Sequence, residues 1–311
     1  MTSPENTPLV AVIATGGTIA SRKDRDGAAS PSLSGQDLLD ILPPMPLRLR
    51  AVELLAKDSS CLTLADMQAI SDRVGAELAN PALSGVVVLH GTDAMEETAL
   101  LLHLRHGAGK PVILTGAQFS ADSPNADGPR NLHDALLSAL DGTGVRVVFG
   151  GRALPAWGLY KLASDRADAF AQAATGAAAI APDLPPLPRP VAEMRVDIVA
   201  LHPGGDAVHL DASLEAGARG IVLAALGSGN GTPEIVEAVT RARARGVPVV
   251  VSSRVPEGRL APAYGGGGGG HDLALAGAIH SRLLRPGQAR ILLAALLANG
   301  CDAKDISAAF A

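Results

Sequence analysis

The sequence has few aromatic residues and few cysteines. Phenylalanine, tryptophan and tyrosine make up 2% of its 311 residues, so the core has to be built mainly from aliphatic side chains and alanine. The two cysteines, Cys61 and Cys301, lie far apart in the chain, which excludes the disulfide framework of a small secreted domain. We therefore expect a large core stabilised by packing alone, with room for two domains in a chain of this length.

The chain also lacks an excess of basic residues, a long apolar run and a signal peptide. Its formal net charge is -5, whereas contact with nucleic-acid phosphates needs a basic surface, so no nucleic-acid partner is expected. The apolar run ILLAALLA is far shorter than a bilayer-spanning helix. The N-terminal segment MTSPENTPLV has no basic start and no apolar core. These absences predict a soluble, cytoplasmic protein without a membrane partner.

Short runs rich in β-branched residues recur along the chain. They are apolar at consecutive positions rather than alternating, which is typical of strands buried on both faces of a parallel sheet. The predicted strands are 9–15, 86–90, 111–116, 145–151, 196–202, 220–226 and 247–253.

Helix signals fall between these strands. Thr63 with Asp66 forms a predicted capping box before an apolar pattern of helical spacing. Pro233 opens a predicted helix that runs to about Arg245, and Pro286 opens another that ends before Gly300. Strands that alternate with helices predict an α/β, doubly wound fold.

A proline-rich segment divides the chain. Residues 181–190 contain five prolines, and proline fits neither a central strand nor a helix interior. We predict a larger N-terminal α/β domain over residues 1–180, an extended linker over 181–192, and a smaller C-terminal α/β domain over 193–311.

Hydroxyl groups and glycines follow two of the predicted strands. Thr15 precedes Gly16 and Gly17 in ATGGTIAS, and Thr92–Asp93 follow a strand in HGTDAMEETA. Ligands of doubly wound folds bind at the carboxyl ends of strands, and a hydroxyl, a carboxylate and backbone N–H groups suit amide hydrolysis. Plainer interpretations stay open: a tight strand-to-helix turn, an N-capping Asp93, and glutamates that complement a helix N-terminus.

Together the two stretches resemble the signature stretches of the bacterial-type L-asparaginases, or asparaginase/glutaminases. Four more segments resemble this family in the right order: 111–136 (PVILTGAQFSADSPNADGPRNLHDAL), 227–232 (GSGNGT), 249–259 (VVVSSRVPEGR) and 284–297 (LRPGQARILLAALL). The resemblance implies hydrolysis of L-asparagine to L-aspartate and ammonia. It implies no cofactor, and the eight scattered histidines show no metal-ligand spacing.

The resemblance also implies roles for individual residues. Thr15 matches the primary nucleophile, while Thr92, Asp93 and Lys161 match a second catalytic constellation in which the lysine helps to activate water. Ser59 matches the residue that binds the α-carboxylate of the substrate, and Asp93 the residue that binds its α-ammonium. The predicted substrate-binding residues are Gly16, Ser59, Ser60, Gly91, Thr92, Asp93, Ala117 and Asn230.

The sequence departs from the family in three places. The loop 21–35 lacks the tyrosine that supports the nucleophile in most members, and Tyr264 before the glycine run 265–270 is a candidate to replace it. Tyr264 packing against the helix that follows is the equal alternative. Thr232 stands where many relatives have a second asparagine, and glycines stand where some members carry an acidic residue that reaches a neighbouring subunit. The preference between asparagine and glutamine therefore stays open.

Other functions remain as alternatives. A glutaminase-leaning or D-amide-accepting amidohydrolase would use the same fold. A non-catalytic amino-acid-binding protein would have lost a nucleophile or the lysine, whereas Thr15, Thr92 and Lys161 are all present. The amidotransferase subunit of this family carries an extra N-terminal domain, whereas this chain begins its first predicted strand at Leu9. The resemblance also implies a homodimer or homotetramer with sites near subunit interfaces.

Overall fold

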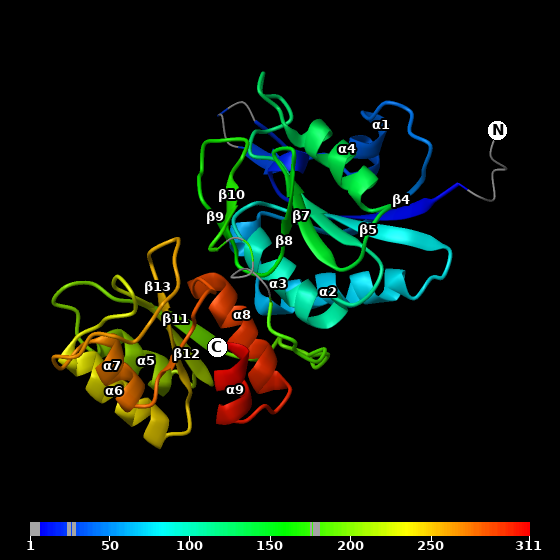
Figure 1. The fold of residues 1–311 in the computed structure, drawn as a ribbon. Helices are drawn as coiled ribbons and strands as arrows, with labels where there is room; N and C mark the ends of the chain where they lie inside the picture. Colours follow the sequence, from blue (N-terminus) through cyan, green and yellow to red (C-terminus); the bar gives the residue numbers. More distant parts are fainter. Residues whose placement is uncertain (1–6, 24–25, 27–28, 175, 177–180) are drawn as a thin grey trace. The chain divides into compact units, whose positions relative to one another are not determined.

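The computed structural model describes residues 7–23, 26, 29–174, 176 and 181–311, which form two compact units. The first unit consists of Met1–Ala156 and Lys161–Ala171, and the second of Trp157–Tyr160 and Gln172–Ala311 (Figure 1). Each unit is a sheet covered by helices, so the predicted two-domain α/β architecture is confirmed. Residues 181–190 belong to no helix or strand.

A six-stranded sheet with the order β4-β1-β5-β6-β7-β8 forms the centre of the first unit. All neighbours are parallel except β7 and β8, which are antiparallel. Helices α1 and α4 share one hydrophobic cluster with the sheet, and α2 and α3 pack together on its other face (Figure 1). The strands are β1 (Leu9–Gly16), β4 (Arg48–Lys57), β5 (Leu83–Leu89), β6 (Val112–Thr115), β7 (Val145–Phe149) and β8 (Arg152–Pro155). The helices are α1 (Gly35–Asp40), α2 (Leu64–Leu78), α3 (Met95–His106) and α4 (Gly128–Ser138).

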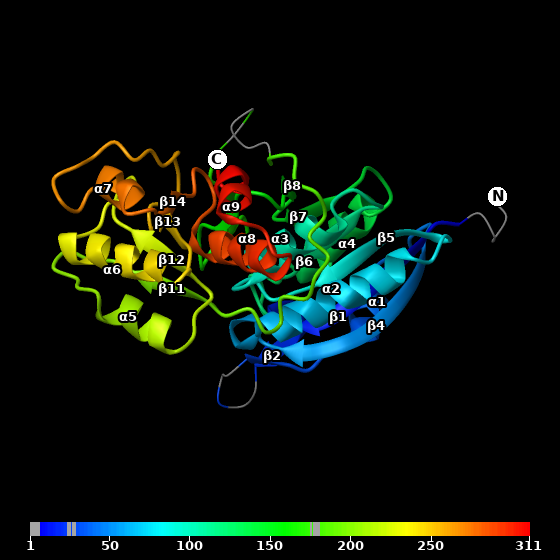
Figure 2. The same ribbon diagram turned by 90° about the horizontal axis from the view of Figure 1, so that it is seen from below.

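The second unit has a four-stranded parallel sheet with the order β11-β12-β13-β14. Helices α5, α6 and α7 pack on one face around a cluster of aliphatic side chains, and α8 covers the other face (Figure 2). The strands are β11 (Val196–Ala200), β12 (Gly220–Ala225), β13 (Val249–Ser253) and β14 (Ile279–His280). The helices are α5 (Val208–Glu215), α6 (Pro233–Ala244), α7 (Gly270–Leu275), α8 (Pro286–Ala298) and α9 (Ala303–Ala309).

Two short pairs of strands lie outside the two main sheets. β2 (Ser21–Lys23) pairs with β3 (Ala29–Pro31), and β9 (Leu159–Lys161) pairs with β10 (Phe170–Gln172). The loop predicted over 21–35 includes residues 24–25 and 27–28, which lie outside the described residues.

The predicted helix signals are confirmed. Thr63 caps α2, because its hydroxyl accepts the N–H of Asp66 and the Asp66 carboxylate accepts the N–H of Thr63. α6 begins at Pro233, and Gly246 follows its end with φ of 73°. Both cysteines are free thiols. Within the described part of the chain, no helix has both the length and the apolar character needed to cross a membrane.

Candidate functional site

The loops that follow β1, β4 and β5 meet at the carboxyl edge of the first sheet. The strand order places β1 between β4 and β5. The next strand after β1 in this sheet, β4, lies on one side of it, and β5 to β7 follow on the other side, so the order in which strands are added reverses between β1 and β5. Such a reversal is where open α/β sheets bind their ligands. Thr15 is the second-to-last residue of β1 and Thr92 follows β5, so both predicted catalytic threonines lie at this switch point.

Glycines bring these loops into backbone contact. Gly17 has φ of 81°, and a Cβ placed on it would lie 2.5 Å from the Cα of Gly91. A Cβ on Gly91 would in turn lie 2.5 Å from the Oγ of Ser59. The Gly17 N–H donates to the Lys57 carbonyl at 3.2 Å. Side chains at Gly17 or Gly91 would therefore push the three loops apart.

Thr15 is almost completely buried at the end of β1. Its side chain is 2% exposed, and its Oγ1 donates a hydrogen bond to the carbonyl of Leu89 on β5 at 2.8 Å. The hydroxyl thus links the two strands that define the switch point. A nucleophilic role requires that this hydrogen bond is exchanged for one to a proton acceptor.

Lys161 joins the other predicted catalytic residues. Its Nζ lies 2.8 Å from Thr92 Oγ1 and 2.7 Å from Asp93 Oδ1. Thr92 is buried, whereas the Asp93 side chain is exposed. The Asp93 N–H donates to Ser59 Oγ at 3.0 Å. The structure therefore brings Ser59, Thr92, Asp93 and Lys161 into one hydrogen-bonded network.

Glu96 also belongs to this network, although the sequence assigned it only to a helix N-terminus. It lies in the first turn of α3, and its carboxylate accepts the backbone N–H of Lys161. Burial raises the pKa of Glu96 to about 7, and the neighbouring Glu97 adds to the rise, while the Lys161 amide and charge oppose it.

His90 is a second residue that the sequence did not single out. It is fully buried between β5 and α3, with Nδ1 2.6 Å from the carbonyl of Gly91 and Nε2 2.9 Å from Thr98 Oγ1. A carbonyl can only accept, so Nδ1 carries the proton and Nε2 accepts the Thr98 hydroxyl. Burial lowers the pKa of His90 to about 4, which keeps the ring neutral behind the Gly91–Thr92 turn.

Two polar side chains hold the backbone of the loop after β6 by hydrogen bonds. Asp127 accepts the backbone N–H groups of Gln118 and Phe119, and Asn131 donates to the carbonyl of Gly116 at 3.0 Å. Ala117, a predicted substrate-binding residue, is buried between these contacts. Asp127 and Asn131 belong to the ADGPRNL segment. The sequence analysis matched this segment to the family but assigned it no function.

Three predicted residues have no hydrogen bond to this network within the described part of the chain. The Ser60 side chain is exposed, and its Oγ lies 3.9 Å from the Cys61 Sγ. Asn230 and Tyr264 belong to the second unit. Asn230 Oδ1 accepts the N–H of Gly270 at 3.0 Å, and Tyr264 is 63% exposed.

Two further positions of the second unit have structural roles. Thr232 caps α6, because its hydroxyl accepts the Ile235 N–H and donates to the Gly205 carbonyl at 3.0 Å. Tyr160, the other tyrosine of the chain, is buried and donates to Glu257 at 3.0 Å. Its phenol is thus directed to Glu257, whereas the side chain of the next residue, Lys161, reaches Thr92.

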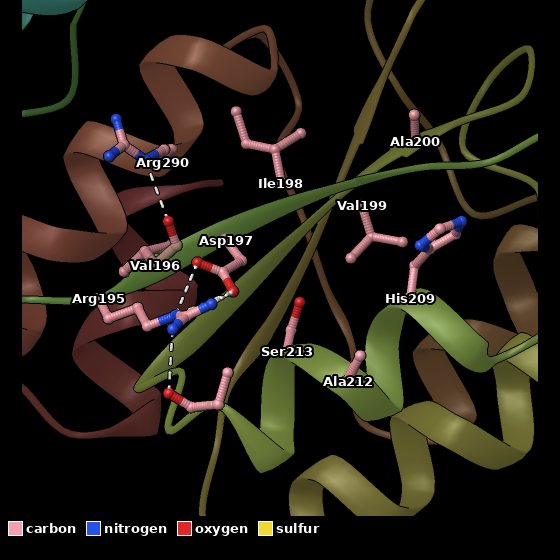
Figure 3. Close-up of a pocket in the computed structure, with 11 residues that line it drawn as sticks. Arg195, Val196, Asp197, Ile198, Val199, Ala200, His209, Ala212, Ser213 and Arg290 are labelled. Carbon is pink, nitrogen blue, oxygen red and sulfur yellow. Dashed lines mark hydrogen bonds and ion pairs between the residues drawn. The ribbon is translucent and has the colours of Figure 1, made fainter. Parts of the chain in front are cut away.

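An open groove of about 820 Å³ lies along the edge strand β11, between α5 and α8 (Figure 3). Arg195 and Arg290 line it, and Arg195 pairs with Asp197 at 2.9 Å while Arg290 Nε donates to the Val196 carbonyl. None of the predicted site residues lines this groove.

Comparisons with known proteins cover nearly the whole chain. The family model "Asparaginase, N-terminal" matches residues 9–183, and the model "Glutaminase/Asparaginase C-terminal domain" matches residues 195–310. A probable L-asparaginase of Deinococcus radiodurans is 37% identical, over 99% of this chain and 98% of that protein. The L-asparaginase of Bacillus licheniformis is 30% identical, over 93% and 95%.

Solved structures give the same result. The fold is similar to that of a probable cytoplasmic L-asparaginase from Campylobacter jejuni, with a TM-score of 0.84 and 28% identity over 97% of this chain and 99% of that chain. The thermostable L-asparaginase from Thermococcus kodakarensis has a TM-score of 0.81 and 26% identity, over 97% and 96%.

Proposed function

Because this chain belongs to the asparaginase family, we propose that it hydrolyses L-asparagine to L-aspartate and ammonia. The observation that carries this proposal is the position of Lys161 Nζ, within 2.8 Å of the Thr92 hydroxyl and 2.7 Å of the Asp93 carboxylate. A hydroxyl in contact with an amine is the arrangement that activates a weak oxygen nucleophile.

In the first half of the proposed reaction, Thr15 attacks the substrate. Its Oγ1 adds to the side-chain amide carbon, and its proton passes to a neighbouring acceptor. The tetrahedral adduct then breaks its C–N bond, and the nitrogen takes up a proton and leaves as ammonia. An aspartyl ester of Thr15 remains.

In the second half, water hydrolyses this ester. A lysine amine accepts a proton only in its neutral form, and neutral Lys161 would draw the Thr92 proton and so activate water through that hydroxyl. Attack on the ester carbon breaks the C–O bond, returns a proton to Thr15 and releases aspartate. No metal or cofactor takes part in the proposed scheme.

The proposed binding of the substrate uses charge at its α-carbon. The Asp93 side chain is exposed, so the α-ammonium of a substrate can reach its carboxylate. Lys161 contacts the same carboxylate. Ser59 is positioned by the Asp93 N–H and is proposed to donate its hydroxyl proton to the α-carboxylate. Such pairing would select a free amino acid over an amide within a peptide.

We also propose a cytoplasmic, homo-oligomeric enzyme, with Tyr264 replacing the absent loop tyrosine. Thr232 caps α6, a task that an asparagine can also perform, so this position does not decide between asparagine and glutamine.

The proposal is tested by ammonia release from L-asparagine, L-glutamine and their D-forms with the purified protein. We expect L-asparagine to have the highest kcat/KM. The absence of ammonia release from all four amides, in a protein that is folded by circular dichroism, would contradict a hydrolytic function.

A further inference from the structure

We propose that Glu96 is a positioning residue that holds Lys161 in register with Thr92 and Asp93. This inference rests on the proposed function, because it assigns a task within the same catalytic network.

Lys161 needs such a link because of its place in the fold. It ends β9, which pairs with β10 in a two-stranded sheet, whereas Thr92 follows β5 of the six-stranded sheet. Among the strands that the structure describes, no β-ladder joins β9 to the six-stranded sheet. Side-chain contacts therefore contribute to fixing the lysine relative to the threonine.

Glu96 supplies the contact at the lysine itself. Its carboxylate accepts the Lys161 N–H, while Thr92 and Asp93 contact the Nζ of the same residue. All three partners lie within the stretch 92–96. The stretch 92–96 thus contacts both the backbone N–H and the Nζ of Lys161. We therefore expect the Nζ and the Thr92 hydroxyl to keep the same relative position.

Other contacts fix the far side of the 161–171 segment. Arg152 donates to the carbonyls of Asp168 and Phe170, and the rings of Phe149 and Phe170 pack edge to face at 5.2 Å. These contacts do not involve Glu96, so we expect the segment to stay folded when Glu96 is changed. Loss of the Glu96 carboxylate is therefore expected to loosen the lysine without unfolding the unit.

The charge of Glu96 adds a pH dependence. Burial raises its pKa to about 7, so the carboxyl changes charge near neutral pH. The charged groups that act on it include Glu97 on its own helix and Lys161 from β9, which is itself paired with Asp93. An N–H bond to a carboxylate is stronger than one to a neutral carbonyl, so the lysine is held best above pH 7.

The test compares Glu96→Ala, Glu96→Gln and the matched neighbour Glu97→Gln. In Glu96→Ala, kcat at pH 8 is expected to fall about 100-fold, the scale of an ångström-sized misplacement, with a small change in KM because Ser59 and Asp93 are intact. Glu96→Gln keeps a carbonyl acceptor, so its loss is expected to be about fivefold. Glu97→Gln is expected to keep wild-type kcat.

The pH profile separates positioning from a merely structural effect. Wild-type kcat is expected to rise through an inflection near pH 7 that is absent in Glu96→Gln, whose flat profile matches the low-pH limb of the wild type. If Glu96→Ala does not fold, this profile of Glu96→Gln still decides.

Three results would overturn the inference: wild-type kcat in Glu96→Ala, an unchanged inflection in Glu96→Gln, or an equal loss in Glu97→Gln. An inactive wild type contradicts the proposed function instead. An active wild type with an inactive Lys161→Ala and a fully active Glu96→Ala contradicts only the role of Glu96.

Discussion

At the scale of single residues, Thr15 combines a structural and a proposed chemical task. Its hydroxyl ties β1 to β5 through the Leu89 carbonyl, and the same oxygen is the proposed nucleophile. The sequence predicted that Thr15 lies at a strand end, but not that its hydroxyl donates a hydrogen bond to the neighbouring strand. Removal of the hydroxyl is therefore expected to affect both stability and turnover.

We predict that Thr15→Ala lowers kcat by roughly 10³-fold or more, the scale seen when a member of a catalytic unit is removed. It also removes the buried hydrogen bond from the Thr15 hydroxyl to the Leu89 carbonyl, which costs about 1 kcal/mol of stability. Thr15→Ser keeps the hydroxyl and is expected to retain measurable turnover and a melting temperature nearer to wild type. Ammonia assays and thermal melts measure the two effects; substantial activity in folded Thr15→Ala would exclude Thr15 as nucleophile.

His90 makes the stability of the fold depend on acid. Its folded pKa of about 4 lies below the ordinary value of 6.5, so the unfolded chain binds the proton first as pH falls. Stability is complete above pH 6.5 and is lost toward pH 4, by about 3 kcal/mol from this group. Burial also lowers the pKa values of His103, His106 and His280. These groups therefore add to the loss of stability as the pH falls.

The contribution of His90 is measured by denaturant unfolding between pH 4 and pH 7. His90→Gln is expected to have a shallower loss of stability over this range than wild type. The exposed His202 serves as the control, and His202→Gln should keep the wild-type slope. Equal slopes in all three proteins would refute the assignment to His90.

Tyr264 is proposed to replace the tyrosine that the loop 21–35 lacks. A phenol both donates and accepts, so it can relay a proton without carrying charge. It is 63% exposed, so Tyr264→Phe is expected to lower kcat markedly with little change in melting temperature. Near wild-type turnover in Tyr264→Phe would show that another group or water relays the proton. Tyr160 is not an equivalent candidate, because its phenol donates to Glu257.

At the scale of elements, the first sheet shows which strands the sequence could predict. The sequence placed β1, β5, β6 and β7 because their apolar runs are continuous. It missed β4, which lies at the sheet edge and carries exposed charged residues such as Arg48 and Lys57. It also missed β8, a four-residue antiparallel strand with mostly exposed side chains.

The glycine run 265–270 appeared in the sequence as flexible low complexity, and the structure gives it a packing reason. The Gly231 N–H donates to the Gly268 carbonyl, and Asp272 accepts the N–H of Gly269. A Cβ on Gly269 would lie 1.9 Å from the Tyr264 carbonyl oxygen. Close backbone contacts, rather than flexibility alone, explain glycine at this position.

Two alanine substitutions within the run test this explanation. Gly269→Ala forces the backbone apart and is expected to cost about 3 kcal/mol. Gly266 has φ of 100° but no atom within 4 Å of an added Cβ, so Gly266→Ala is expected to cost only about 1 kcal/mol. Chemical denaturation of both variants gives the comparison, and equal costs would argue against a packed loop.

At the scale of the whole molecule, the two-domain architecture followed from the sequence, but the path of the chain did not. The proline-rich segment marked a division near residue 181, whereas the chain already passes from one unit to the other at residues 156–157, 160–161 and 171–172. The linker over 181–192 stays a prediction. The early crossings depend on tertiary contacts of Trp157–Tyr160, which no local pattern reveals.

The same gap explains which part of the candidate site was missed. Thr15, Thr92 and Asp93 stand at strand ends, and the family resemblance supplied Lys161. Glu96 looked sufficient as a helix N-terminal charge, because its partner, the Lys161 amide, lies 65 residues away. Only the folded chain brings the two together.

We predict a homodimer or homotetramer, because the family resemblance implies sites completed by a second subunit. Sedimentation velocity at assay concentration is expected to give a mass of at least twice 31.4 kDa. Specific activity is expected to fall on dilution as subunits separate. A fully active monomer would contradict both statements.

The return of the chain to the first unit at Lys161 has a consequence for synthesis on the ribosome. The first unit takes its last segment from residues 161–171, so a nascent chain that has exposed only β1 to β8 still lacks the lysine of the site. Residues 157–160 emerge before that segment but belong to a unit whose sheet begins at Val196. The sheet of the first unit is therefore available for folding before its proposed catalytic network, and all residues of that network have been synthesised before those of the second sheet.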